Sequence, residues 1–359
     1  MKNNTLVILD LSKNYDLSEK NIKFVSLNKG LINLDKCEQI YLKNFPQEKR
    51  DVYKKLLSKL SNIIFKNKNN PLIEFEVNNL RNDRYDFIDR IINLSIINKI
   101  ILSTNFDTIK IISDNKNTLD KFDKLNIKIE KIDFSKKEKK VNFFRLKLLK
   151  FYLKALIITI FLRLRKKSFI QKKDVESYFS IIPNKFKYYK KDLDKELIIN
   201  FLLTDETHLN HNLFEIFKVI KNQKSKNLIN IESLISIKYL IFLIFKTLFL
   251  KIEYNFHLDD FRINGLSFKK EIKFFYFISY LNRSKLDIYN HAIKIFLKKF
   301  DIKTVHMYLF EYSFGFYFIN KIRNFSKQIK INGYQHGVFS ENLLWLDVLR
   351  LTKNKKKYL

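Results

Sequence analysis

The chain has 359 residues, enough for two ordinary domains or one large one, and its 46% hydrophobic content allows a sizeable core. Only 5 Gly and 3 Pro argue against a disordered chain, and the single Cys37 excludes an internal disulfide framework. The net charge of +32 would suit nucleic acid or an anionic membrane, but Lys far outnumbers Arg, the residue that base readers favour, so nucleic-acid binding ranks lowest.

The first 135 residues alternate between strand-like and helical segments. Helical spacing of apolar residues predicts one helix from Pro46 to Asn67 and another over 85–103. Short apolar runs predict strands at 5–11, 22–28, 37–43, 72–76, 108–113 and 127–134. This alternation predicts an α/β fold, a parallel sheet with helices on both faces. We interpret residues 1–135 as a Rossmann-like region, and the lack of GxGxxG gives no support to dinucleotide binding.

The composition of residues 136–190 predicts a basic, apolar helical segment with a membrane-surface contact. No acidic residue occurs over 139–173, and the longest uncharged stretch there, 155–162, is far shorter than the roughly 20 residues that cross a bilayer. A helix here would place several basic residues on one stripe, namely Lys147, Lys150, Lys154 and Arg165. Such a helix would lie on an anionic membrane surface. The alternative is a buried packing helix whose lysines reach out to water.

The apolar pattern over residues 191–340 predicts that the α/β fold continues there. Strands are expected at 196–204, 304–310 and 329–334, and helices at 213–222, 232–254, 268–300 and 312–325. No secretory signal precedes the first strand, so we expect a cytoplasmic chain.

Two of these strands end in residues that could carry chemistry. One ends in Glu311, and the other runs into a Gly-Tyr-Gln-His-Gly motif at 333–337. Ligands of open α/β sheets bind outside the carboxyl ends of the strands. The imidazole of His336 could hydrogen-bond a phosphate or transfer a proton, and Glu311 could act as a general base. Gly333 and Gly337 would allow close backbone approach to a ligand. The alternative is that the motif only caps a strand.

Residues 304–347 resemble the middle of bacterial surface-carbohydrate biosynthesis proteins, a GT-B-like glycosyltransferase group. The shared pattern is an apolar strand ending in Glu311, a helix with basic residues, the Gly-Tyr-Gln-His-Gly motif, and a short Ser and aromatic stretch. The resemblance implies a GT-B-like N-terminal half with a helical membrane-facing insertion. Residues 341–359 would then begin a C-terminal domain that the chain lacks, and a separately encoded C-terminal half is an expected partner.

The resemblance also implies an activity. A sugar would pass from a nucleotide-sugar donor to a lipid-linked or saccharide acceptor, at the inner face of the cytoplasmic membrane. His336 and Glu311 would be catalytic, while Gly333, Gln335, Gly337 and Arg323 would bind substrate. Neither a bound cofactor nor a metal is expected. The rival hypothesis is a non-catalytic, membrane-associated subunit or an inactive remnant of such an enzyme.

A weaker signal follows the strand at 196–204. Asp205 and Glu206 stand near His208 and His211, a set that could suggest a metal site. The spacing lacks convergent ligand geometry, so we favour a substrate-binding role for Asp205 and Glu206 on the acceptor side.

Overall fold

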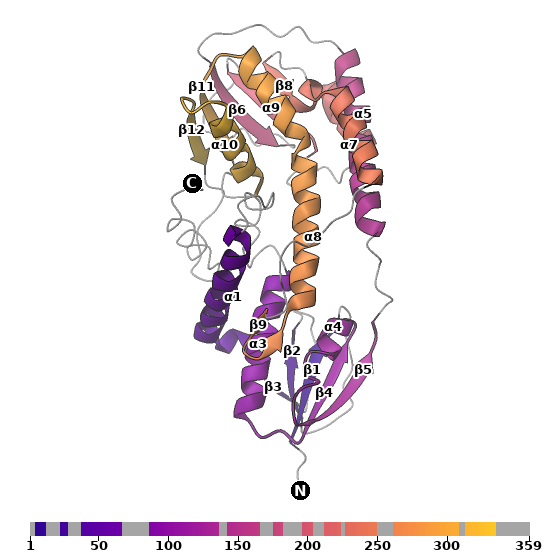
Figure 1. Ribbon diagram of the computed structural model, residues 1–359, viewed down its shortest axis with the longest axis vertical. Helices are drawn as coiled ribbons and strands as arrows, with labels where there is room; N and C mark the ends of the chain where they lie inside the picture. The colour runs from indigo at the N-terminus through magenta and orange to yellow at the C-terminus, as the bar shows by residue number, and fades with distance from the viewer. Residues whose placement is uncertain are drawn as a thin grey trace.

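The computed structural model describes the chain in eleven ranges: 4–11, 22–27, 37–66, 86–135, 142–165, 175–181, 196–203, 212–223, 227–249, 261–308 and 313–334. These residues form an α/β fold with two parallel five-stranded sheets and one two-stranded hairpin (Figure 1). The α/β, Rossmann-like part of the sequence prediction is thereby confirmed.

The first sheet has the strand order β3-β2-β1-β4-β5, and all neighbouring strands are parallel. Its strands are β1 (Thr5–Asp10), β2 (Lys23–Ser26), β3 (Glu38–Gln39), β4 (Thr108–Ser113) and β5 (Lys128–Asp133). Its helical elements are η1 (Leu42–Asn44), α1 (Pro46–Lys66), α3 (Asp86–Ser103) and α4 (Lys116–Leu119). Leu6 and Ile8 pack into a core with α1 and α3, whereas Val7 and Leu9 join a smaller cluster on the opposite face. Strand β1 is therefore apolar on both faces, as central parallel strands usually are.

The second sheet has the order β12-β11-β6-β7-β8, again all parallel. Its strands are β6 (Val175–Ile181), β7 (Leu197–Phe201), β8 (Leu228–Asn230), β11 (Ile302–Tyr308) and β12 (Lys330–Tyr334). Around it lie α5 (Asn142–Leu164), α6 (Leu213–Asn222), η3 (Ile231–Leu234), α7 (Ile237–Leu248), α9 (Ile288–Lys299) and α10 (Ser313–Phe325). Its core is rich in aromatic rings, and Phe201 contacts Phe179, Tyr289 and Phe318 with ring centroids 4.6 to 5.5 Å apart.

Both sheets have the same topology. The first strand in the chain is central, the next two lie on one side of it, and the last two lie on the other. The chain therefore changes direction across the sheet between β1 and β4, and again between β6 and β11. In open α/β sheets such switch points are where ligands bind, outside the carboxyl ends of the strands.

A hairpin and a long helix connect the two sheets. The hairpin strands β9 (Arg262–Ile263) and β10 (Leu266–Ser267) join through Asn264 and Gly265, whose positive φ values of 48° and 83° suit a tight Asn-Gly turn. Helix α8 (Lys269–Leu286) follows. Its Ile272 packs into the first core, and its Leu281 and Leu286 pack into the second. Figure 1 accordingly shows α8 running between the two sheets.

The structure divides the chain differently from the sequence. Segment 136–190, expected to be helical, contains β6, which lies beside β11 and β7 in the second sheet. The hairpin within 191–340 packs on the first core rather than the second. The physical reason is long-range burial: Phe261, Ile263 and Phe268 are buried against the first sheet although they follow β8 in sequence. The expected strand at 72–76 and the segment 341–359 lie outside the described residues.

The expected helix at 232–254 also differs, because the structure has η3 and then α7 over that stretch. Ser236 begins α7, and its side chain accepts a hydrogen bond from the amide of Tyr239. Among the helices described, none is both long and apolar enough to cross a membrane.

Candidate functional site

The strands that precede the predicted site are neighbours. β11 and β12 pair in parallel, with Met307 beside Gly333 and Tyr308 beside Tyr334. Tyr308 is the last described residue before Glu311, and Tyr334 is the last before Gln335. The two strands therefore point toward one edge of the second sheet, next to the switch point between β6 and β11.

Only two of the predicted site residues lie in the described part of the chain. Gly333 is an exposed residue of β12, and among the described glycines only Gly265 has a positive φ. Arg323 is exposed in the last turn of α10, about 15 Å along the helix axis from Ser313, which follows β11. The structure does not bring Arg323 to the carboxyl edge. The other predicted residues lie outside the described ranges: Asp205, Glu206, Glu311, Gln335, His336 and Gly337.

A polar cluster links three strands just below this edge. The Nδ1 atom of His306 lies 2.8 Å from the Tyr334 hydroxyl, and its ring stacks on Tyr178 with centroids 4.2 Å apart. The Nε2 atom of His306 lies 3.4 Å from a carboxylate oxygen of Glu176. These contacts join β6, β11 and β12, so the Tyr334 side chain of the Gly-Tyr-Gln-His-Gly motif is held by buried His306. Nothing in the spacing of the sequence indicated His306.

A buried carboxyl group lies at the carboxyl ends of β7 and β8. Glu232 in η3 is fully buried, and its Oε1 atom accepts hydrogen bonds from the Leu202 amide at 2.7 Å and the Leu203 amide at 3.2 Å. The Tyr289 hydroxyl donates to the same oxygen at 2.7 Å. Burial raises the pKa of Glu232 to about 7, and these three hydrogen bonds oppose the rise.

Glu232 therefore fixes Leu202 and Leu203, which follow β7. These are the last described residues before Asp205 and Glu206. A carboxyl group with a pKa near neutrality could transfer protons. Its complete burial gives it a positioning role in this structure, because it does not reach solvent.

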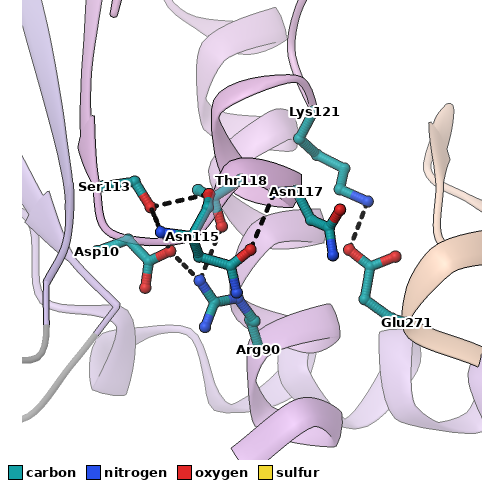
Figure 2. A network of polar contacts seen from close by, with 8 residues as sticks. All are labelled: Asp10, Arg90, Ser113, Asn115, Asn117, Thr118, Lys121 and Glu271. Carbon is teal, nitrogen blue, oxygen red and sulfur yellow. Dashed lines mark hydrogen bonds and ion pairs between the residues drawn. The ribbon is translucent and has the colours of Figure 1, made fainter. Parts of the chain in front are cut away.

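The switch point of the first sheet carries a second polar network (Figure 2). Asp10 ends β1 and is completely buried, and it forms an ion pair with Arg90 of α3. The Ser113 hydroxyl, at the end of β4, donates to the same Asp10 oxygen at 2.9 Å. Arg90 also donates to the Thr118 hydroxyl at 2.8 Å. Burial lowers the pKa of Arg90, while Glu271 and Asp114 raise it, and the guanidinium stays charged.

The same network reaches the start of α8. Lys121 donates to Glu271 at 2.6 Å and to the Ser267 carbonyl at 2.6 Å, and both charged side chains of the pair are 7% exposed. Burial lowers the pKa of Lys121, and Glu271 raises it in opposition. Three acceptor oxygens in Figure 2 have no donor among the described residues: one each on Asp10, Asn117 and Glu271. Buried acceptors of this kind usually bind water or a ligand's N–H or O–H groups.

Within the described ranges, no group of His, Cys, Asp and Glu is arranged to hold a metal ion. The set around His208 and His211 lies outside those ranges. Cys37 is half-buried beside the small cluster of the first sheet.

No protein-family model, no curated protein and no solved structure matches this chain.

Proposed function

We propose that this chain transfers a sugar from a nucleotide-sugar donor to a lipid-linked or saccharide acceptor, as GT-B-like enzymes of bacterial surface polysaccharide biosynthesis do. The observation that carries the proposal is the parallel, in-register pairing of β11 with β12. Both strands end at one edge of the second sheet, the kind of edge at which α/β folds bind nucleotides, and Glu311 and His336 follow these strands in the sequence.

The fold adds support. A GT-B arrangement uses two Rossmann-like units, and this chain has two parallel sheets with the same strand order, joined by α8. A separately encoded C-terminal half stays as the alternative source of the second unit. In either arrangement, the Gly-Tyr-Gln-His-Gly motif would contact the donor.

The proposed step needs one base and one group that stabilises the leaving phosphate. The acceptor hydroxyl attacks the anomeric carbon, its proton passes to the Glu311 carboxylate, and the bond from that carbon to the phosphate oxygen breaks. His336 donates a hydrogen bond to the departing nucleotide phosphate. Gln335, Gly333 and Gly337 would shape the donor site. Neither a metal nor a bound cofactor takes part in these assignments.

We also propose that α5 and α7 contact an anionic membrane, at the cytoplasmic face. The two helices lie side by side (Figure 1). Neither contains an acidic residue, and Lys147, Lys150 and Lys246 are exposed on them. Their outer surface carries ten large apolar side chains that are at least 41% exposed: Leu146, Leu153, Ile157, Ile160, Leu164, Ile241, Phe242, Phe245, Leu248 and Phe249. Such a face suits the interface of a bilayer.

A nucleotide-release assay tests sugar transfer. The full chain would be incubated with a panel of nucleotide sugars and a membrane extract as the source of acceptor. We expect His336→Ala and Glu311→Gln to lose at least about a hundredfold in rate, because each removes a group that acts in the transition state. Lys124→Gln, an exposed change far from this edge, serves as the control. Equal rates for wild type and His336→Ala would remove His336 from the mechanism.

Sedimentation with anionic vesicles tests the membrane contact separately. We expect binding at low salt and weaker binding at high salt. Phe242→Ser with Phe245→Ser should reduce binding at both salt concentrations, because apolar burial is not screened. Vesicle binding without any nucleotide release would favour the rival function, a non-catalytic membrane-associated subunit.

A further inference from the structure

A cavity of about 270 Å³ lies beside β8, the edge strand at the other side of the second sheet from β11 and β12. It lies between the end of α5, the end of α6, strand β8 with η3, and the end of α9. A water molecule takes about 30 Å³ in the liquid, so the cavity has room for a group much larger than water. Its lining residues are Leu162, Arg163, Arg165, Ile220, Gln223, Leu228, Asn230, Ser233, Leu234 and Lys299.

The charged groups that line the cavity are all cationic: Arg163, Arg165 and Lys299. Backbone carbonyls hold the two guanidiniums. Arg163 donates to the Ile235 carbonyl at 2.7 Å, and Arg165 donates to the Ile220 carbonyl at 2.7 Å. A carbonyl fixes the position of a guanidinium without cancelling its charge. Among the described residues, no carboxylate pairs with either arginine, and each keeps further N–H donors for a ligand.

The polar wall of the cavity is ordered by an amide network. Asn230 and Gln223 exchange two hydrogen bonds, at 2.7 and 3.2 Å, and Asn200 donates to the same Asn230 oxygen at 3.0 Å. The buried Ser233 hydroxyl beside them has no hydrogen-bond partner among the described residues. Buried hydroxyls of this kind usually bond to water or to a ligand oxygen.

We propose that this cavity binds a phosphate group, either as a free phosphate or as the headgroup of an anionic lipid. Arginine is the residue best suited to phosphate, because its planar fork of donors matches two phosphate oxygens at once. Leu164 lies between the two arginines in the sequence and is 79% exposed outside the cavity, so a lipid chain attached to the phosphate would pass around the end of α5 to reach the apolar face of α5 and α7. The site is distinct from the sugar-transfer edge and does not depend on that activity.

Two probes on the full chain test the proposal and separate the two sources of phosphate. The first is calorimetric titration with inorganic phosphate. The second is sedimentation with phosphatidylcholine vesicles, with and without phosphatidic acid. We expect Arg165→Gln and Lys299→Gln each to weaken phosphate-dependent binding about tenfold, the usual effect of losing one charge-assisted hydrogen bond. Lys124→Gln carries the same loss of charge on the first unit and should bind as wild type does.

The two probes distinguish a site for free phosphate from a site for a lipid headgroup. Binding of inorganic phosphate that Arg165→Gln weakens supports a site for free phosphate. Binding only to vesicles with phosphatidic acid, weakened in the same variant, supports a lipid headgroup. Phe242→Ser with Phe245→Ser should reduce vesicle binding and leave phosphate titration unchanged. Thermal unfolding confirms that each variant is folded, and Lys299→Gln leaves the arginine–carbonyl contacts in place. No binding in either arm, or equal binding by wild type, Arg165→Gln and Lys299→Gln, would overturn the proposal.

Discussion

The two sheets share one topology, but their buried carboxyl groups are stabilised differently. In the first, buried Asp10 is paired with Arg90, and buried Glu271 is paired with Lys121. In the second, Glu232 is buried with no cationic partner among the described residues, and two backbone amides and a tyrosine hydroxyl hold it. A paired charge stays ionised, whereas an unpaired one moves its pKa toward neutrality.

This difference separates the roles of the two regions. The ion pairs and hydrogen bonds of the first unit join the ends of β1 and β4 to α3, and the turn after α4 to α8, so they hold elements that are far apart in sequence. The carboxyl group of the second unit fixes the end of a strand that leads into the segment containing Asp205 and Glu206. We therefore expect the first unit to depend most on charge pairing and the second to respond most to pH.

The largest effect should follow from breaking the Asp10–Arg90 pair. Arg90→Ala leaves a fully buried carboxylate without its cation, which typically lowers the free energy of unfolding by about 3–5 kcal/mol. Chemical denaturation followed by circular dichroism would measure the loss. The double variant Asp10→Asn with Arg90→Ala should recover part of it, because the uncompensated charge is gone. A loss below about 1 kcal/mol in the single variant would show that this pair does not hold the switch point together.

The next effect concerns pH and the second unit. The pKa of Glu232 is about 7 in the folded chain, against an ordinary value of 4.5, so the folded state holds this proton more tightly. Its contribution to stability is therefore present below about pH 4.5 and is lost as pH rises toward 7. Glu232→Gln cannot ionise. Relative to wild type, its free energy of unfolding should improve between these two pH values by on the order of 3 kcal/mol. A difference that does not change with pH would contradict the raised pKa.

The smallest effect on stability should come from breaking an exposed ion pair, in contrast with the buried pairs above. Lys131 lies 2.6 Å from Asp123, but both side chains are substantially exposed, at 33% and 48%. Lys131→Gln should lower the free energy of unfolding by less than about 1 kcal/mol, and the effect should shrink in high salt. A loss as large as that of Arg90→Ala would show that exposure does not govern these pairs.

Much of the fold followed from apolar pattern. Strand β4 and helix α6 begin and end where the sequence predicted, at Thr108–Ser113 and Leu213–Asn222, because each is a sharply bounded apolar segment. Strand β6 was missed because it follows a long basic helix and its burial depends on distant β11. Strand β8 was missed because three residues carry too little pattern.

The candidate site was predictable only in part. The sequence indicated two strands followed by Glu311 and the Gly-Tyr-Gln-His-Gly motif, and a strand–helix–strand unit normally forms a parallel pair. Arg323 shows where prediction from the sequence fails. Helix α10 returns the chain to the start of β12, so its last turn, which holds Arg323, lies at the end of the sheet opposite the carboxyl ends of the strands. Glu232 and His306 could not be found from spacing, since their partners lie 28 or more residues away.

Cysteine cross-linking tests the central claim, that Glu311 and His336 lie together at one edge of the second sheet. In a Cys37→Ser background, Glu311→Cys with His336→Cys would be treated with a short bifunctional thiol reagent. Thr304→Cys with Lys330→Cys, an in-register pair of β11 and β12, serves as the positive control, and Glu311→Cys with Arg323→Cys as the negative one. We predict cross-linking of the 311–336 pair as efficient as that of the positive control. No cross-link at 311–336, with the positive control cross-linked, would contradict the shared site and with it the proposed sugar transfer.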